Sequence, residues 1–570
     1  MIGLPFIIWA GLLAAPYWGQ NLIELIGNLA VAFETPFQIS ICPNTRKTVL
    51  LFCVLYTVCI LYILASQRNT RYGEEHGSAE WGVPKNVCKA LSCKSFSDNR
   101  IFTANVRISY NFFKHQRNVN TTVVGGSGAK KTRGYVMPNI MQNNCSNIIL
   151  DPMGEILAGC GKLLESEGTQ IKVLDLIEMD KSNHYNPFCY LRDEKDVQTM
   201  VSFMFTSTTP SDSKSNDPFW DQAAEVLLKA ICFYLWLEAP PEEQTFAMVM
   251  EMLRCTALDD NEECIADVLF DELERRQPDH VALKYWRDYR NGSEKTLKSI
   301  QLVLAAHLEK FNLPALATMT ADDTLELRSL GETKTALFLR LSDSDKSFNF
   351  IASMLYTQVI QQLFECADLK YHGRLPVHVH LMMDEFANVA LPQEFESYLS
   401  TMRKRNMSAS IILQNIAQLK SLFKESKWES ILGNCDELLY LGGNEQSTHE
   451  YISKQLGSET IWTRSNNLSH GRNGSYSRND STIERKLMTP DEVRSLDNDH
   501  AILFIRGYPP LCDLKYDLNK HPKIKQTVMG GGIPYEHGKP SAVTNNGESQ
   551  ESLQNVEILT KSQLEENLGI

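Results

Sequence analysis

The chain lacks the cysteine spacing of a disulfide framework or of a zinc module. Its 14 cysteines are scattered over 570 residues, with no C-x-x-C pair and no repeating interval. Cysteines used in this way are typical of a reducing compartment. An internal repeat is also missing from the sequence.

An excess of positive charge is absent as well. Lys and Arg number 56 against 69 Asp and Glu, which gives a formal net charge of −13. This balance excludes a general polyanion-coating protein, so any contact with nucleic acid must come from local basic patches. An apolar content of 43% over this length is enough for several packed domains.

Charged residues are missing from two N-terminal stretches. Met1–Tyr17 is almost wholly apolar, and Val49–Ala65 is an uncharged run of about 17 residues, near the lower limit for spanning a bilayer. The loop up to Thr45 has no Lys or Arg, whereas Arg68 and Arg71 follow the second stretch. Because positive residues favour the inner side, we predict a two-pass cell-membrane anchor with the bulk of the chain in the cytoplasm. Two buried core helices are the alternative.

A glycine-rich turn opens a helix directly after the apolar strand pattern Thr121–Val124. The N–H groups of such a turn point at one spot that suits a phosphate chain, and the following lysine and hydroxyl suit the terminal phosphates and Mg²⁺. We therefore predict nucleotide binding by Gly125, Gly126, Ser127, Gly128, Ala129, Lys130, Lys131 and Thr132, with Thr132 as a metal ligand. The loop matches G-x-x-x-x-G-K-[ST] except that Lys130 replaces the last glycine. A lysine there either points outward or distorts the loop, and a surface turn before a basic helix is the alternative interpretation.

A second apolar run, Val377–Met383, ends in two carboxylates. It has the pattern of a buried parallel strand, and Asp384 and Glu385 follow at the edge where ligands bind to α/β sheets. We expect Asp384 to hold Mg²⁺ and Glu385 to orient or deprotonate the attacking water. His378 and His380 lie on one face of the run, and we expect them to be packed or partner-bound rather than metal ligands.

A third run, Ser408–Leu413, ends at Gln414. A neutral amide at that place can bond a γ-phosphate or its water. The basic segment before this run contains Arg403 and Arg405. In a ring of subunits these arginines could reach the neighbour's nucleotide as catalytic fingers, and a solvated basic helix end is the alternative.

Short apolar runs alternate with helical patterns, as a parallel sheet with crossover helices requires. Further strands are expected at Asn147–Leu150, Ile171–Leu176, Thr335–Leu341, Glu437–Gly442 and His500–Arg506. The polar segment Ser465–Ser481 has the composition of a mobile hairpin tip or loop. We predict a membrane anchor at 1–66, a connector at 67–120, a nucleotide-binding domain in two parts at 121–240 and 329–525, an all-α domain at 241–328 and a disordered tail at 526–570.

Several short motifs follow one another in order along the chain. They are Asp151–Glu155, Tyr185–Phe188, Asp217–Trp220, Met383–Phe386, Ile412–Leu419 and Leu487–Glu492. With the apolar N-terminus and the glycine loop, this order resembles the type IV coupling proteins, the TraG-type membrane ATPases of conjugation and type IV secretion. The resemblance extends to about Lys520. Lys130 and Met153 depart from the family pattern.

The resemblance implies an α/β fold: a RecA-like P-loop NTPase domain with an inserted all-α domain, preceded by two transmembrane helices. It also implies ATP and Mg²⁺ as cofactors and assembly as a homo-hexamer around a central channel. The implied partners are a relaxase joined to single-stranded DNA, or a protein effector, and the type IV secretion channel. Lys131, Thr132, Asp384, Glu385 and Gln414 occupy the positions of the family's phosphate lysine, metal hydroxyl, acidic pair and third-motif glutamine.

Two functions remain open at this point. The first is an ATP-driven motor that transfers the substrate, in which hydrolysis changes the contacts between subunits. The second is a membrane platform in which Lys130 has silenced catalysis and the all-α domain recruits the transfer substrate. The intact lysine, hydroxyl, acids and glutamine favour the motor.

Overall fold

The computed structural model describes residues 3–18, 22–66, 71–208, 219–257, 264–342, 345, 347–386, 395–423, 426–468 and 476–538. The chain divides into two compact units, one formed by residues 1–78 with 458–485 and the other by 79–457 with 486–570.

The smaller unit begins with three helices, α1 (Leu4–Ala14), α2 (Leu22–Ala32) and α3 (Thr45–Ser66). In the described part of the chain, α3 alone is long and apolar enough to cross a membrane; the apolar helix at Leu4–Tyr17 is shorter. The expected second span is therefore not confirmed. The helices α1 and α3 run antiparallel, because Gly3 lies against Tyr56 while Gly11 lies against Val49.

The same unit contains a long hairpin of β10 (Ser458–Leu468) and β11 (Tyr476–Lys486). The Thr460 hydroxyl accepts hydrogen bonds from the backbone N–H groups of His76 and Gly77, so the base of the hairpin is attached to the segment that follows α3. We predict a mobile hairpin tip or loop over Ser465–Ser481, but its described residues, 465–468 and 476–481, belong to the two strands. Residues 469–475 lie outside the described residues.

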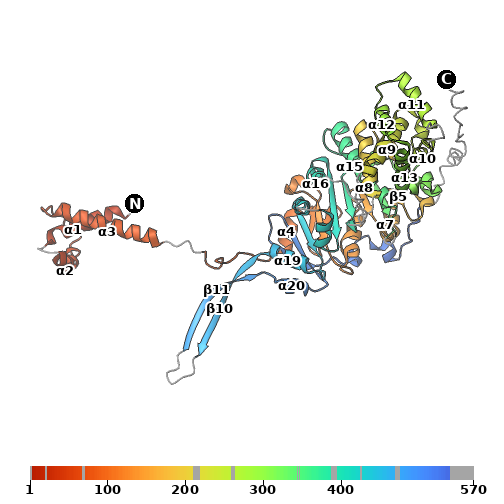
Figure 1. The fold of residues 1–570 in the computed structure, drawn as a ribbon. Coiled ribbons are helices and arrows are strands. Elements are labelled where there is room, and N and C mark those ends of the chain that lie inside the picture. Colours follow the sequence, from red (N-terminus) through yellow and green to blue (C-terminus); the bar gives the residue numbers. More distant parts are fainter. Residues whose placement is uncertain are drawn as a thin grey trace. The chain divides into compact units, whose positions relative to one another are not determined.

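The larger unit is built on a nine-stranded mixed sheet in the order β13-β12-β9-β3-β8-β7-β4-β6-β5. Figure 1 shows helices packed around the strands of this unit. The strands are β3 (Thr121–Val124), β4 (Ser146–Leu150), β5 (Gln170–Asp175), β6 (Thr335–Arg340), β7 (Val379–Met383), β8 (Met407–Leu413), β9 (Glu437–Tyr440), β12 (His500–Ile505) and β13 (Leu511–Leu514). The strand β12 pairs antiparallel with both β9 and β13, and the other pairs are parallel. This architecture confirms the predicted α/β class.

Helices cover both faces of this sheet. Leu381 and Met383 belong to one core, with α15 (Asn349–Glu365) and α8 (Glu194–Thr208), while Met382 belongs to the other, with α6 (Met137–Gln142) and α7 (Glu155–Ser166). Since alternate side chains point to opposite faces, both kinds of position must be apolar. The uninterrupted apolar run in the sequence follows from this double burial.

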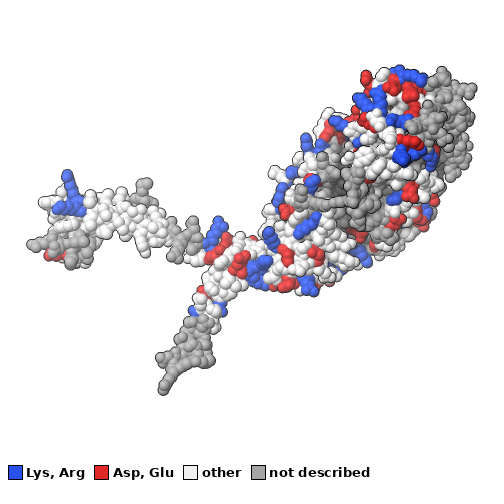
Figure 2. Space-filling model, viewed as in Figure 1, with Lys and Arg blue, Asp and Glu red and all other residues white. Residues whose placement is uncertain are grey.

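A cluster of helices lies between β5 and β6 in the chain (Figure 1). It contains α9 (Phe219–Glu238), α10 (Phe246–Cys255), α11 (Ile265–Arg276), α12 (Val281–Arg290), α13 (Glu294–Leu308) and α14 (Pro314–Met319). Stacked rings such as Phe270 on Trp286, with centroids 4.2 Å apart, hold it together. The helix α9 packs on α12 and α13 although it ends before residue 241. The start of the all-α domain at residue 241 therefore remains a prediction. Figure 2 shows acidic and basic side chains interspersed over this cluster.

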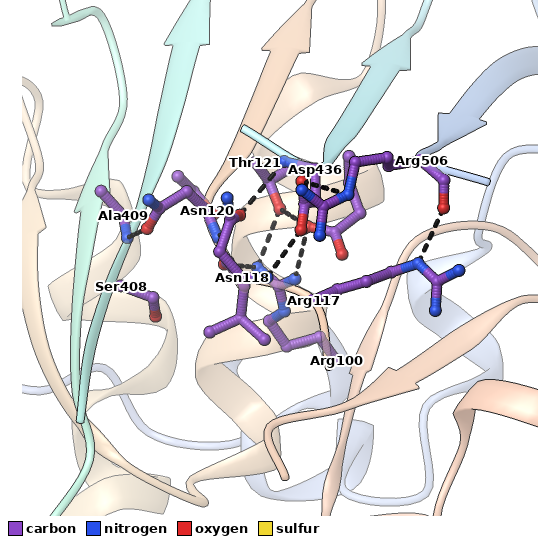
Figure 3. Close-up of polar contacts among 12 residues, drawn as sticks. Arg100, Arg117, Asn118, Asn120, Thr121, Ser408, Ala409, Asp436 and Arg506 are labelled. Carbon is purple, nitrogen blue, oxygen red and sulfur yellow. Dashed lines mark hydrogen bonds and ion pairs between the residues drawn. The ribbon is translucent and has the colours of Figure 1, made fainter. Parts of the chain in front are cut away.

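Polar side chains fix the beginning of β3 between its two neighbours (Figure 3). The Asn120 amide oxygen accepts from the Ala409 N–H of β8 at 3.0 Å. On the other side, the Asn118 N–H donates to Asp436 at 2.6 Å, and Asp436 also pairs with Arg506. These bonds position β3, and therefore the glycine loop at its far end.

The C-terminal prediction needs a correction. We expected a disordered tail from residue 526, but the described chain continues to residue 538 and packs on the larger unit. The Tyr535 N–H donates to the Ala158 carbonyl at 3.1 Å, and His537 lies 2.7 Å from Asp175. Local composition missed this segment because its partners belong to α7 and β5. Residues 539–570 lie outside the described residues.

Candidate active site

The glycine loop connects β3 to a helical segment and lies beside the loop that follows β9. The Gly126 N–H donates to the Gly442 carbonyl at 2.8 Å, and the Gly125 N–H donates to the Leu413 carbonyl at the end of β8. A Cβ on Gly126 would come within 3.3 Å of the Gly443 Cα. Close backbone packing therefore favours glycine at position 126.

Lys130 takes the backbone conformation that the loop demands of its last residue before the lysine. Its φ of +67° lies in the left-handed region, where glycine is the usual residue. Its amine pairs with Asp499 at 2.7 Å on the exposed surface. Of the two alternatives from the sequence, the side chain therefore takes the outward one, and the turn forms around it.

The amine of Lys131 lies over the loop itself. It donates to the Gly125 carbonyl at 2.9 Å and to the Gly126 carbonyl at 3.2 Å. A phosphate oxygen is a stronger acceptor for an ammonium group than a neutral carbonyl. The amine is thus placed where it can exchange these loop carbonyls for a phosphate.

The two distant halves of the predicted site meet at a hydrogen bond. Thr132 Oγ1 donates to Asp384 Oδ2 at 2.9 Å across 252 residues of sequence. The pKa of Asp384 is raised above its usual value, because the effect of burial exceeds the opposing effects of the Thr132 hydroxyl and the Lys131 ammonium. A hydroxyl beside a buried carboxylate is a donor set that fits Mg²⁺, which prefers oxygen ligands.

Glu385 lies immediately beyond Asp384 and is half-buried. Its φ is +55°, and its N–H donates to Asp384 Oδ1 at 3.1 Å. A non-glycine residue in this conformation is strained, and such strain concentrates at functional sites. Residues 387–394 lie outside the described residues.

Gln414 begins the loop after β8 at the same edge of the sheet, because β8 is parallel to β3 and β7. Its side chain is exposed, and its N–H donates to Gln418 Oε1 at 3.0 Å. The structure thus brings the third predicted strand end to the edge that carries the glycine loop.

Arg403 and Arg405 precede β8, so they lie at its opposite end from Gln414, roughly 20 Å away along the strand. Arg405 forms a forked ion pair with Asp368, the shorter bond being 2.6 Å. The guanidinium of Arg403 stacks over the Phe112 ring. The structure does not bring these arginines to the site of their own chain.

Some groups around the site were not given a role from the sequence. Asp151 follows β4, accepts from the N–H groups of Ile156 and Leu157, and its pKa is raised by burial to about 6. Its motif was visible, but its nearness to Asp384 follows from the pairing of β4 with β7. Lys515, which donates to the Ala129 carbonyl at 3.0 Å, gave no sequence signal.

A cavity of about 500 Å³ lies against the outer side of the loop. It is lined by Lys130, Arg133, Gly134, Asp499, Leu514, Lys515, Tyr516, Asp517, Leu518 and Asn519. Burial lowers the pKa of Lys515 to about 8. The basic side chains in this cavity, Lys130, Arg133 and Lys515, make the surroundings of the glycine loop suitable for an anionic ligand.

The fold and the site together define a nucleotide-binding protein of the α/β class. The chain belongs to the family described as type IV secretory system conjugative DNA transfer, whose model matches residues 92–527. The resemblance stated from the sequence motifs is thereby confirmed.

Curated relatives agree with this assignment. The protein VirD4 of Agrobacterium fabrum is 22% identical over 499 residues, which cover 84% of this chain and 71% of VirD4. The conjugal transfer protein TraG of Rhizobium radiobacter is 23% identical over 401 residues, covering 68% of this chain and 60% of TraG.

The fold is similar to solved structures of the plasmid coupling protein TrwB. The complex of TrwB with the non-hydrolysable ATP analogue ADPNP matches with a TM-score of 0.55 and 15% identity, covering 79% of this chain and 96% of TrwB. The complex with ADP and Mg²⁺ matches with a TM-score of 0.55 and 16% identity, covering 79% and 97%. At this identity the likeness shows the fold alone.

Proposed function

We propose that this chain is a membrane-anchored ATPase that couples a relaxase–single-stranded DNA substrate, or a protein effector, to a type IV secretion channel and drives its transfer. Membership of the conjugative DNA transfer family gives the class of process. The hydrogen bond from Thr132 to Asp384, with Lys131 beside it, is the observation that supports nucleotide hydrolysis at this place.

In this proposal the larger unit is a RecA-like P-loop domain that binds ATP with Mg²⁺. Thr132 and Asp384 would hold the metal ion, which neutralises charge that develops on the phosphates. The loop N–H groups and Lys131 hold the phosphate chain. Glu385 orients or deprotonates the attacking water, and Gln414 senses the terminal phosphate.

We infer further that the chain is anchored in the cell membrane and assembles as a homo-hexamer. The antiparallel packing of α1 on α3 supports a two-pass anchor, with the nucleotide site in the cytoplasm. Arg403 and Arg405 lie away from the site of their own chain, which suits a role in the site of a neighbour in a homo-hexamer. The partners are the transfer substrate and components of the secretion channel.

The test is ATP hydrolysis by the full chain in detergent, with and without single-stranded DNA. We expect Lys131→Ala and Glu385→Gln to lower kcat by about 100-fold or more, since each removes charge stabilisation or water activation. The exposed Glu294→Gln, on the surface of α13, is the matched control and should retain the wild-type rate. A wild-type rate no higher than that of Glu385→Gln would contradict the motor and favour the recruitment platform.

A further inference from the structure

A line of buried polar side chains connects the helical segment after the glycine loop to strands β7 and β8. Tyr135 Oη lies 2.8 Å from Ser410 Oγ, and Ser410 Oγ lies 2.9 Å from His380 Nε2. His380 Nδ1 lies 2.6 Å from Ser408 Oγ, which in turn lies 2.7 Å from His378 Nε2. These side chains are fully buried except for the half-buried His378, so their bonds are formed within the protein.

The far end of the line determines the direction of every bond in it. Asn406 donates from Nδ2 to the Leu375 carbonyl, so its Oδ1 faces Arg374, which can only donate, and His378 Nδ1, 3.2 Å away. His378 must therefore carry its proton on Nδ1 and accept at Nε2. The Asn406 amide thus sets the tautomer of His378.

The tautomer of His378 in turn fixes which groups donate and which accept in the rest of the line. The Ser408 hydroxyl has one hydrogen and donates it to His378 Nε2, so it must accept a hydrogen bond from His380 Nδ1. His380 Nε2 then accepts from Ser410, and Ser410 accepts from Tyr135. All bonds point from Tyr135 towards Asn406, and a group that reversed one of them would leave two acceptors facing each other.

Both imidazoles stay neutral in this environment. Burial lowers the pKa of His378 to about 4, and burial with the nearby Arg100 guanidinium lowers that of His380. The line is therefore a fixed connection between neutral groups. It explains why two histidines lie on one face of the apolar run Val377–Met383, where we expect them to be packed or partner-bound.

The line gives the helical segment a second attachment to the strand that carries Asp384. Thr132 bonds Asp384 just beyond the end of β7, and Tyr135, three residues later, reaches His380 of β7 through Ser410. Thr132–Val136 forms a π-helical turn, a wide turn often found at functional sites. Two attachments on one strand restrict both the position and the rotation of this turn.

We propose that Tyr135, Ser410 and His380 are positioning residues that place the Thr132 hydroxyl for the magnesium–nucleotide complex. This inference rests on the proposed function, because it concerns the same site. A displacement of about 1 Å at a reacting centre is enough to lower a rate by up to 100-fold. Loss of the Tyr135 hydroxyl should therefore lower kcat, although this hydroxyl is buried away from the substrate and acts only through the position of Thr132.

The test compares Tyr135→Phe with Tyr356→Phe in the full chain in detergent. Both tyrosines are fully buried, but the Tyr356 hydroxyl has no hydrogen-bond partner among the described residues. We expect Tyr135→Phe to lower kcat for ATP about tenfold with KM changed less than threefold, and Tyr356→Phe to keep both values within twofold. Equal kcat values for the two variants would overturn the inference.

A spectroscopic measurement separates this inference from the proposed function. In ¹⁵N-histidine-labelled protein, His380 assigned with His380→Gln should be neutral with its proton on Nδ1. Addition of Mg²⁺ and ADPNP should shift its Nε2 resonance in wild type and leave it unshifted in Tyr135→Phe. A proton on Nε2, or an equal shift in both proteins, overturns the inference. A wild type that does not hydrolyse ATP contradicts only the motor, since the resonance is read without turnover.

Discussion

At the scale of single residues, Lys130 is the departure that bears most on activity. Its backbone conformation costs an L-residue about 1–2 kcal/mol relative to a right-handed one. The side chain leaves the loop and pairs with Asp499, so it adds no bulk on the phosphate side. The structure thus supports a loop that keeps its shape in spite of the substitution.

Replacement of Lys130 by glycine tests this directly. Lys130→Gly relieves the left-handed strain but frees the unfolded chain, so the free energy of unfolding should change by less than about 1 kcal/mol. We expect kcat to stay within threefold of wild type, because the loop already has the torsions of a glycine. The measurements are thermal unfolding and steady-state ATP hydrolysis.

A large gain of activity in Lys130→Gly would contradict this expectation. If Lys130→Gly raised hydrolysis tenfold or more from a wild-type rate equal to that of Glu385→Gln, Lys130 would be a silencing residue and the platform would be the better function. Asp499→Asn is the control, because it removes the exposed ion pair without changing the loop backbone.

At the scale of elements, the segment after β13 shows what a local pattern cannot reveal. Its composition indicated disorder from residue 526, yet Tyr535 packs against Gly161 of α7 and its N–H bonds the Ala158 carbonyl. A Cβ at Gly161 would lie 2.5 Å from the Tyr535 ring, so glycine provides the space for that ring.

Two glycines of α7 give a matched pair of variants. Gly161→Ala should displace Tyr535, whereas a Cβ at Gly159 meets only Met137 at an ordinary 3.5 Å. Both changes raise helix propensity by about 1 kcal/mol, so they differ mainly in the contact with Tyr535. We expect hydrogen exchange at residues 531–538 to accelerate at least tenfold in Gly161→Ala and to stay unchanged in Gly159→Ala. Equal protection in both variants would show that Tyr535 does not hold the segment.

Most strands were visible in the sequence as apolar runs, because burial on both faces requires apolar side chains at consecutive positions. Within the nine-stranded sheet of the described chain, the sequence did not predict β13, an edge strand of four residues, Leu511–Leu514, with alternating buried and exposed positions. Such a short half-buried strand has too little periodicity to stand out from a loop.

At the scale of the whole molecule, the two arginines before β8 raise the question of a site shared between chains. Arg405 is held by Asp368, and Arg403 stacks on Phe112, at the end of β8 opposite to Gln414. A catalytic role for either arginine therefore requires a second chain. This view rests on the proposed homo-hexamer.

Mixed assemblies test such sharing. Glu385→Gln and Arg403→Ala should each abolish most hydrolysis alone. In an equal mixture, about a quarter of the interfaces would combine an intact Glu385 with a neighbour's intact Arg403, and activity should recover to about that fraction of wild type. Recovery should require co-assembly and be absent when the two variants are purified separately and kept apart. A co-assembled mixture without activity would contradict a finger in trans.

Periodicity and motifs a few residues long were enough to predict the α/β class and a helical segment between strands, and to propose the residue types of the site. The folded chain was needed to find the strand order, the contact of Thr132 with Asp384 across 252 residues, the outward direction of the Lys130 side chain and the hydrogen-bonded line through His380. Strand pairing and buried hydrogen bonds join groups far apart in the chain, and no local pattern specifies their partners.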